Sequence, residues 1–214
     1  MKNHTYLFLI FFCLSCQNQK YKDISSSHND KSYYNLFEKE ITDNNGTVIK
    51  FSIPNEWDKQ VNPDNETLVQ YVLLSPSTPT GYIFSIRKLE SRNTIKLNDK
   101  EYLDIMLSYC DISTTECLDE MGKLLPPNIY KNNKVVDIQG LIINNNYFGK
   151  RVSYFQDGRL DGSYLEDINI TEFQFITLQN KRKYTINISY IGEDKGLSEL
   201  IGFMNTIGGS VKFY

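Results

Sequence analysis

The sequence contains very little histidine: its 214 residues include two, His4 and His28. His4 falls in a leader that we predict is removed, so His28 is the one histidine of the mature chain. A Ser–His or Cys–His nucleophile needs a histidine positioned as its base, and a zinc site of Cys and His needs three or four such ligands. The shortage of histidine excludes both classes, and we predict no catalytic residue, no metal site and no cofactor.

Basic residues are not in excess either, because 23 Lys and Arg face 26 Asp and Glu, for a formal net charge of -3 at pH 7. A nucleic-acid-binding domain normally carries a basic patch, so we expect no nucleic-acid partner. Glycine-rich phosphate loops of the Walker and dinucleotide-binding types are absent. Aromatic side chains are plentiful by contrast, with 15 Tyr and 12 Phe, and this composition favours strands.

The apolar run near the start of the chain, Tyr6 to Cys13, is too short to cross a bilayer as a helix, which takes about 20 residues. It follows the charged Lys2 and precedes the small Ser15. A positive start, a short apolar core and a small residue before the cleavage point are the parts of a secretory signal. We therefore predict that residues 1–15 are a signal peptide.

This signal ends in Cys13-Leu14-Ser15-Cys16, which resembles the lipobox of bacterial lipoproteins. The resemblance implies that Cys16 receives a diacylglycerol and usually an N-acyl chain, and two or more chains hold a protein firmly to a membrane. Cys13 stands where the lipobox usually has Leu, which is a departure from the pattern. The alternative is an ordinary secreted protein with an odd cysteine. No early acidic cluster follows Cys16, so we expect the lipid-anchored protein in the bacterial cell envelope, on the periplasmic side of the outer membrane.

The stretch that follows is polar and offers almost nothing to bury. Such a segment cannot offset its ordering entropy, so residues 16–33 are predicted to be a lipidated flexible tether. Residues 34–214 then form a single domain. His28 lies in the tether and is interpreted as a solvated residue.

Alternating apolar and polar residues predict strands over much of the domain. Asn45-Gly46 lies between two such runs and is a strong hairpin signal, with positive φ expected at both residues. The apolar parity changes within residues 165–178, so we expect a bulge near Thr171 or Glu172. The predicted strands are 34–41, 47–53, 68–75, 82–89, 135–143, 147–155, 165–178 and 184–190, with a short edge strand in 210–214.

Helical spacing of apolar residues occurs near 102–110, near 114–125 and in a last helix from Leu197 to Ile207. Gly208-Gly209 is expected to cap this last helix. Short hairpin connections imply an antiparallel sheet. The predicted fold is therefore α+β, a mostly antiparallel β-sheet sandwiched by helices.

The second predicted strand runs into Phe51-Ser52-Ile53-Pro54-Asn55-Glu56-Trp57. A helix follows near the middle of the chain, and paired strands lead to the helix that contains Leu197 and Met204. Over roughly residues 35–213 this pattern resembles the PsbP-like (Mog1/PsbP) domain family, whose bacterial lipoproteins include the DcrB type. The resemblance implies an antiparallel sheet sandwiched by helices, and a binding or assembly role without catalysis.

Cys110 and Cys117 lie at the end of one predicted helix and the beginning of the next. In an oxidising envelope such a pair is interpreted as a disulfide, which would contribute about 2–3 kcal/mol. The alternative is two buried thiols that act as small apolar side chains. Their spacing is not Cys-x-x-Cys, so no oxidoreductase activity is proposed.

Acidic residues give two weaker signals. Asp157-x-Arg159-x-Asp161-Gly162 partly matches a calcium loop, but Arg159 occupies a ligand position, and the alternative is an Asx-turn loop. The pairs Glu166-Asp167 and Glu193-Asp194 have adjacent side chains, which point to opposite faces of a strand and do not converge on one substrate atom.

These observations predict a non-catalytic binding or assembly module that is held to the membrane through its lipid anchor and binds a protein partner in the envelope. Aromatic side chains would form its contact surface, because they dominate the cores of interfaces. The rival function is an envelope hydrolase that uses acidic residues. An immunity or stress protein is a third alternative, which the sequence does not separate from the first.

Overall fold

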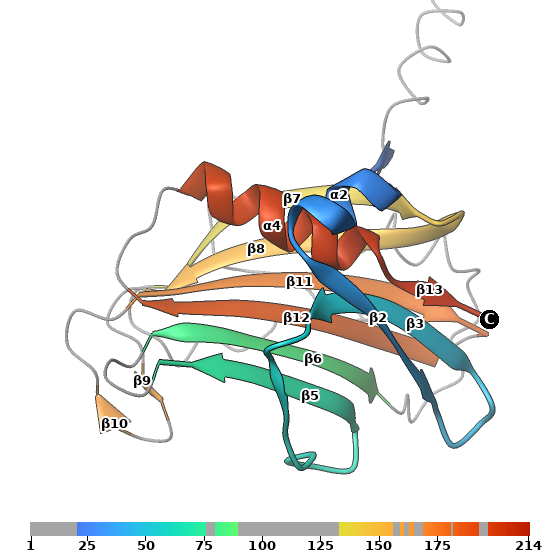
Figure 1. Cartoon of the computed structure of the whole chain (residues 1–214), viewed down its shortest axis with the longest axis horizontal. Helices are drawn as coiled ribbons and strands as arrows, with labels where there is room; N and C mark the ends of the chain where they lie inside the picture. The colour runs from blue at the N-terminus through green and yellow to red at the C-terminus, as the bar shows by residue number, and fades with distance from the viewer. Residues whose placement is uncertain are drawn as a thin grey trace, which may run out of the picture.

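The computed structural model of the chain describes residues 21–75, 80–89, 133–155, 159–160, 163–164, 169–180, 182–192 and 197–214. Within these residues the chain forms an eight-stranded sheet, a three-stranded sheet, a small hairpin and two helices (Figure 1). The fold is α+β and mostly sheet. The predicted helices near 102–110 and 114–125 lie outside the described residues.

The larger sheet has the strand order β1-β7-β8-β11-β12-β6-β5-β4. Its neighbouring strands are antiparallel, apart from β1 and β7, which run parallel. The predicted antiparallel sheet is therefore confirmed. Its strands are β1 (Tyr21–Asp23), β4 (Asp58–Lys59), β5 (Thr67–Leu74), β6 (Gly81–Leu89), β7 (Asn133–Ile143), β8 (Asn146–Phe155), β11 (Asn169–Gln179) and β12 (Arg182–Gly192).

The smaller sheet has the order β13-β3-β2, and the predicted edge strand near the C-terminus is its β13. Together with α4 it forms a layer over one face of the larger sheet, while α2 packs against β2 and α4 (Figure 1). The bounds of these elements are β2 (Leu36–Thr42), β3 (Val48–Pro54), β13 (Lys212–Phe213), α2 (His28–Tyr33) and α4 (Leu197–Gly209), and the small hairpin is β9 (Arg159–Leu160) with β10 (Ser163–Tyr164).

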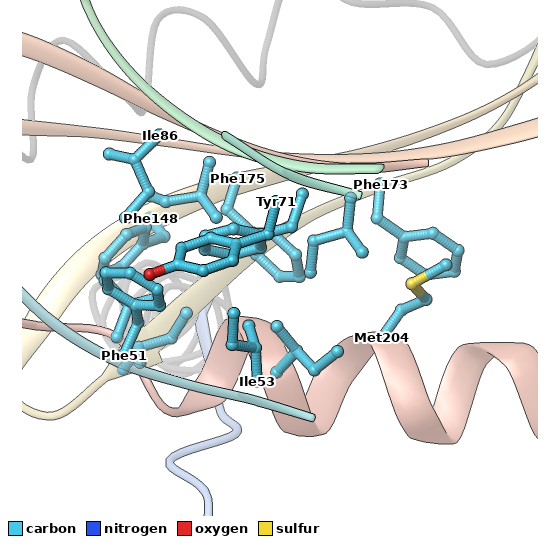
Figure 2. Packing of buried hydrophobic residues seen from close by; sticks show 14 of the residues in the cluster. Phe51, Ile53, Tyr71, Ile86, Phe148, Phe173, Phe175 and Met204 are labelled. Carbon is cyan, nitrogen blue, oxygen red and sulfur yellow. The ribbon is translucent and has the colours of Figure 1, made fainter. Parts of the chain in front are cut away.

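The core lies between these two layers. Phe51 and Ile53 of β3 and Met204 of α4 face Phe173 and Phe175 of β11 (Figure 2), and all five side chains are fully buried. Burying a large apolar side chain contributes roughly 1.5–3 kcal/mol. The apolar residues whose alternation with polar ones predicted these strands therefore lie on the face where the two layers meet.

Two hairpin turns differ from one another in backbone conformation. Asn144 and Asn145 both have positive φ, 47° and 67°, as the two-residue turn between β7 and β8 requires. At the β2–β3 hairpin, Gly46 has a φ of 84° whereas Asn45 does not have a positive φ. The hairpin was predicted correctly, but positive φ at both Asn45 and Gly46 was wrong.

The carboxylate of Asp43 explains this second turn. It accepts hydrogen bonds from the backbone N–H groups of Asn45 (2.8 Å) and Thr47 (2.9 Å). The N–H of Gly46 donates to the Asp43 carbonyl oxygen at 3.1 Å. These bonds hold a four-residue turn, Asp43 to Gly46, in which one glycine supplies the left-handed conformation.

The bulge expected near Thr171 or Glu172 is not present. β11 pairs without a register shift with β12 and with β8 across both residues. Thr171 and Phe173 point into the core, whereas Ile170 and Glu172 lie on the opposite face of the sheet. The prediction was wrong because it assumed that every isoleucine of this stretch faces the core.

The last helix is confirmed, but its two terminal glycines belong to it and do not cap it. A Cβ atom on Gly208 would lie 2.4 Å from a ring carbon of Phe175. A Cβ atom on Gly209 would lie 2.2 Å from the carbonyl oxygen of Ile24. The glycines therefore allow the end of α4 to approach the sheet and the N-terminal segment closely.

Residues 21–33 were predicted to be part of a flexible tether, and this prediction is wrong. Tyr21–Asp23 pairs with Gly140–Ile142 of β7, and the N–H of Ser26 donates to the carbonyl oxygen of Gly209 at 3.0 Å. Backbone pairing to the sheet compensates for the lack of apolar side chains in this stretch. The domain therefore begins at or before Tyr21, and not at residue 34.

Candidate binding surface and polar clusters

The predicted lipidation site Cys16 and the predicted disulfide Cys110–Cys117 lie outside the described residues, and both stay predictions. The same holds for Glu166-Asp167, for Glu193-Asp194 and for the aspartates of the calcium-like loop. His28 is exposed at the start of α2. Arg159 pairs with Tyr164 in the β9–β10 hairpin.

No three His, Cys, Asp or Glu side chains of the described ranges lie close enough together to hold a metal ion. Neither of the helices that the structure describes combines the length and the apolar character needed to span a bilayer. The chemistry of the described part of the chain therefore has to be sought in its aromatic and charged clusters.

A group of aromatic rings, which we call the aromatic cluster, runs from the core to the surface beside the start of β6. Trp57 is 4% exposed, and its ring stacks on that of Tyr82, with centroids 5.5 Å apart and an interplanar angle of 18°. Phe203 of α4 meets both rings edge-on, at 6.2 Å from Trp57 and 5.4 Å from Tyr82. The members of the cluster are Tyr33, Tyr34, Trp57, Tyr82, Tyr190 and Phe203.

The outer end of the aromatic cluster reaches solvent through α2. Tyr34 lies 5.3 Å from Phe203, and Tyr33 lies 4.8 Å from Tyr34 with its ring nearly perpendicular. Tyr33 is 81% exposed. A Cβ atom on Gly202 would lie 2.9 Å from the Tyr34 hydroxyl oxygen, so this glycine leaves room for Tyr34 against α4.

Local sequence places these two tyrosines. Ser27 and Asp30 form a capping box that starts α2: the Asp30 N–H donates to Ser27 Oγ at 3.1 Å, and the Ser27 N–H donates to Asp30 Oδ2 at 2.9 Å. The chain then reverses at Asn35, which has a φ of 54°. The short helix thus presents its last residue, Tyr33, to solvent, and Tyr34, the residue after the helix, packs against Phe203 of α4.

The motif Phe51 to Trp57 supplies the inner end of the cluster. Phe51 and Ile53 are buried on β3, and Trp57 follows the end of that strand with its backbone N–H bonded to the Pro54 carbonyl oxygen at 3.5 Å. The two ends of the motif therefore serve packing in two places, the central core and the aromatic cluster.

A buried ion pair lies at the other end of β6. Lys88 Nζ is 3.2 Å from Asp43 Oδ2 and 2.6 Å from Asn44 Oδ1, and both charged side chains are buried. The hydroxyl of Tyr184 on β12 donates to Asp43 Oδ2 at 2.8 Å. Since Asp43 belongs to the β2–β3 turn, these contacts join the smaller sheet to the larger one.

The surroundings of Asp43 favour its charged form. Burial raises its pKa, but hydrogen bonds from Tyr184, from the backbone N–H groups of Asn45 and Thr47 and from Lys88 outweigh this effect and bring the pKa to about 2. Asp43 is therefore ionised at neutral pH, and both of its carboxylate oxygens contact donors within the fold. This arrangement indicates a structural role.

The sequence interpretation missed this ion pair, although a signal for it was present. Lys88 has the same parity as Phe84 and Ile86, and both of these face the core. A lysine on the apolar parity of a strand indicates a buried cation that needs a partner. Asp43 offered no such signal, because a turn aspartate is normally solvated.

The far face of the larger sheet carries a second charged group. Burial raises the pKa of Glu172 on β11, and the charge of Arg151 on β8 opposes this shift. Gln174 on the same face donates to the side-chain oxygen of Asn187 at 3.1 Å. A carboxyl with a raised pKa is a candidate acid, and this is the feature that a hydrolase would need.

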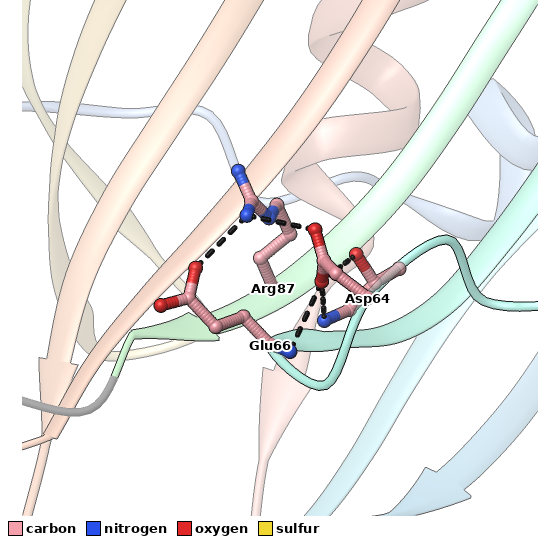
Figure 3. Close-up of polar contacts among 4 residues, drawn as sticks. Asp64, Glu66 and Arg87 are labelled. Carbon is pink, nitrogen blue, oxygen red and sulfur yellow. Dashed lines mark hydrogen bonds and ion pairs between the residues drawn. The ribbon is translucent and has the colours of Figure 1, made fainter.

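A third charged cluster lies near the surface, where Arg87 contacts two carboxylates (Figure 3). Its Nη2 lies 3.1 Å from Asp64 Oδ2 and 2.9 Å from Glu66 Oε2. Asp64 Oδ1 also accepts hydrogen bonds from the N–H groups of Glu66 and Thr67 and from the Thr67 hydroxyl. These contacts fix the loop before β5. The guanidinium of Arg87 is thereby paired with two carboxylates of the same chain.

The sequence matches no known family profile, and no curated protein matches it. Among solved structures the chain is similar to LpqN, involved in cell envelope biogenesis of Mycobacterium tuberculosis, over 88% of this chain and 96% of that one, with 9% identity and a TM-score of 0.47. It is also similar to PsbP (CyanoP) from Synechocystis sp. PCC 6803, over 83% and 92% of the two chains, with 12% identity and a TM-score of 0.43. Overlap of this quality is too loose to assign a family or a function.

Proposed function

We propose that the chain is a membrane-anchored lipoprotein of the bacterial cell envelope that acts as a non-catalytic binding or assembly module for a protein partner. The aromatic cluster carries this proposal. Tyrosine, tryptophan and phenylalanine are enriched in the cores of protein interfaces, and here an exposed Tyr33 is backed by rings that lead to the buried Trp57. The cluster thus offers a partner an apolar contact that is already held in place.

A crosslinking experiment tests the binding role. Tyr33 is replaced by a photo-crosslinking aromatic amino acid in the full chain expressed in its own envelope. The matched control carries the same group at Val61, an apolar residue that is 92% exposed and lies outside the aromatic cluster. A discrete adduct at position 33 and none at position 61 supports the proposal. Equal labelling at both positions, or no adduct at position 33, contradicts it.

The anchor is tested separately through Cys16. Acylation is supported by the small Ser15 before Cys16, and a final position on the periplasmic side of the outer membrane is supported by the lack of an early acidic cluster after it. Cys16→Ala is expected to release the protein into the soluble envelope fraction. Unchanged retention of the Cys16→Ala variant in the membrane fraction would show that another segment anchors the chain.

The Cys110–Cys117 bridge is part of the same proposal, because an oxidising compartment favours it. A thiol-reactive reagent applied to the denatured, unreduced mature protein is expected to find neither cysteine free. Two reactive thiols would rule the bridge out.

Among the residues that the structure describes, Glu172 is the one that favours the rival function, an envelope hydrolase. General acid catalysis calls for a carboxyl of raised pKa, and hydrolysis usually adds a second carboxylate or a positioned water. Among the described residues the charge that acts on Glu172 is that of Arg151. Glu172→Gln should leave the biological function of a binding module intact. In a strain that depends on the protein, loss of that function in the Glu172→Gln variant would favour the hydrolase.

A further inference from the structure

We propose that the β1 edge of the larger sheet rests on the surface of a lipid bilayer, with Tyr21 and Tyr147 at the lipid headgroups. This inference rests on the proposed acylation of Cys16 and adds an orientation to it. It follows from the length of chain between the anchor and the first strand, and from the side chains found where that chain joins the fold.

Few residues separate the anchor from the domain. Tyr21 lies five positions after Cys16, and an extended chain spans at most about 3.6 Å per residue, or about 18 Å in all. Tyr21 cannot move away from the fold, because β1 pairs with Gly140–Ile142 and the N–H of Ile24 donates to the Ile142 carbonyl oxygen at 3.1 Å. The edge formed by β1 and β7 is thereby kept close to the membrane.

The side chains at this edge suit a headgroup region. The rings of Tyr21 and Tyr147 meet edge-on with centroids 5.1 Å apart, and Tyr147, 37% exposed, alternates along β8 with the buried Phe148. Tyrosine and lysine are enriched where a protein meets the membrane interface, and Lys22 is exposed next to Tyr21. The negative charge of Asp23 in the same strand is engaged by the N–H and hydroxyl of Ser25.

The opposite edge of the same sheet is formed by β4, which makes it a natural reference point. The two edges are seven strand spacings apart in the eight-stranded order, which at about 4.8 Å per spacing is roughly 34 Å. Val61, which follows β4, is far more exposed than Tyr147. If exposure of an apolar side chain were sufficient for lipid contact, Val61 would be the better candidate, whereas the anchor favours Tyr147.

The test uses tryptophan as a probe of lipid contact in the full lipidated chain. In a Trp57→Phe background, Tyr147→Trp and Val61→Trp are reconstituted in phosphatidylethanolamine and phosphatidylglycerol vesicles whose acyl chains are brominated near the headgroup. The proposal predicts that Tyr147→Trp loses at least half of its emission relative to vesicles without bromine, and that Val61→Trp loses none. Equal quenching of both probes, or of neither, overturns the orientation.

Mass spectrometry of the same preparations separates the two ways of failing. An acylated Cys16 without selective quenching contradicts the orientation alone and leaves the proposed anchor in place. An unmodified Cys16 contradicts the anchor, and the orientation falls with it. Cys16→Ala versions of both probes give the baseline for quenching that does not depend on the anchor.

Discussion

The two ends of the β6–β12 strand pair close the core in opposite ways. Tyr82 is paired with Tyr190 at one end, within the aromatic cluster, and Lys88 with Tyr184 at the other, beside Asp43. Six residues of strand, about 20 Å, separate these ends. The polar end satisfies both oxygens of Asp43 with internal donors, whereas the aromatic end continues ring by ring to the exposed Tyr33. The difference marks the Lys88–Asp43 ion pair as a lock that joins the two sheets, and the aromatic end as the exposed surface that we propose binds a partner.

The largest effect is expected from breaking the lock. Lys88→Met leaves the buried carboxylate of Asp43 without its cation, and breaking a buried pair in this way costs about 3–5 kcal/mol of the free energy of unfolding. Urea denaturation of the two proteins measures the change. Lys50→Met is the matched control, because Lys50 pairs with exposed Glu40 and Glu38 and should cost at most about 1 kcal/mol. Equal losses for both variants would show that the ion pair is no lock.

Acid should weaken the same end. The pKa of Asp43 in the folded protein is about 2, below its ordinary value of 3.8. Its contribution to stability is therefore present above pH 3.8 and is lost as the pH falls from there through about 2; the difference corresponds to roughly 2 kcal/mol. Denaturation midpoints measured across this range are expected to fall less steeply for Asp43→Asn. A parallel decline in the two proteins would mean that other carboxyls dominate the acid sensitivity.

Two glycines of α4 sharpen the comparison, since Gly208 lies against the closed core and Gly202 against the aromatic cluster. Gly208→Ala drives a methyl group into the buried ring of Phe175 and should destabilise the protein by about 1–3 kcal/mol. Gly202→Ala meets only the hydroxyl of Tyr34, which can move, and alanine favours the helix by up to about 1 kcal/mol. Thermal unfolding should therefore distinguish the variants, and similar losses for both would contradict an adaptable aromatic end.

The smallest effect on stability is expected at the exposed end of the cluster. Tyr33→Ser removes a ring that is mostly in solvent, so the free energy of unfolding should change by no more than about 0.5 kcal/mol. The emission of Trp57, the only tryptophan of the chain, should also stay unchanged. A stability loss comparable to that of Gly208→Ala would show that Tyr33 belongs to the packing of the domain and not to a binding surface.

Strands such as β5 and β11 could be predicted from the sequence because one face of each is buried, whereas the short β1 and β4 bury no side chain and were not predicted. The alternation of apolar and polar residues in β12 indicates its buried face directly, and so does the run of β6 from Tyr82 to Ile86. Strand order could not be predicted, because pairing such as that of β12 with β6 joins segments about 100 positions apart and follows from the whole layer. The prediction of a bulge near Thr171 was wrong for a related reason. Ile170 lies on the face of the sheet opposite the core, and an apolar side chain alone does not show which face of a strand it occupies.

The candidate site was harder to predict than the fold. Trp57 was identified through its motif, but the rings that it contacts, Tyr82 and Phe203, come from β6 and α4, and no sequence pattern brings these together. Residues 21–33 were assigned to a tether because their side chains are polar, and composition says nothing about backbone bonds such as that between Ser26 and Gly209. The lock was missed because half of it, Asp43, is an ordinary turn residue in sequence.

The smaller sheet has a consequence for how the chain is made. Its central strand receives a partner strand from the opposite end of the sequence: the N–H of Ser52 donates to Ser210 Oγ across 158 positions, and Tyr214 exchanges backbone bonds with Val48. A chain that emerges N-terminus first, from a ribosome or a secretion pore, exposes Ile49, Phe51 and Ile53 early and covers them late. Pairing between segments so far apart in the sequence slows folding and prolongs the exposure of apolar, aggregation-prone strands. We therefore expect the β2–β3 hairpin to be the segment on which a chaperone dwells longest.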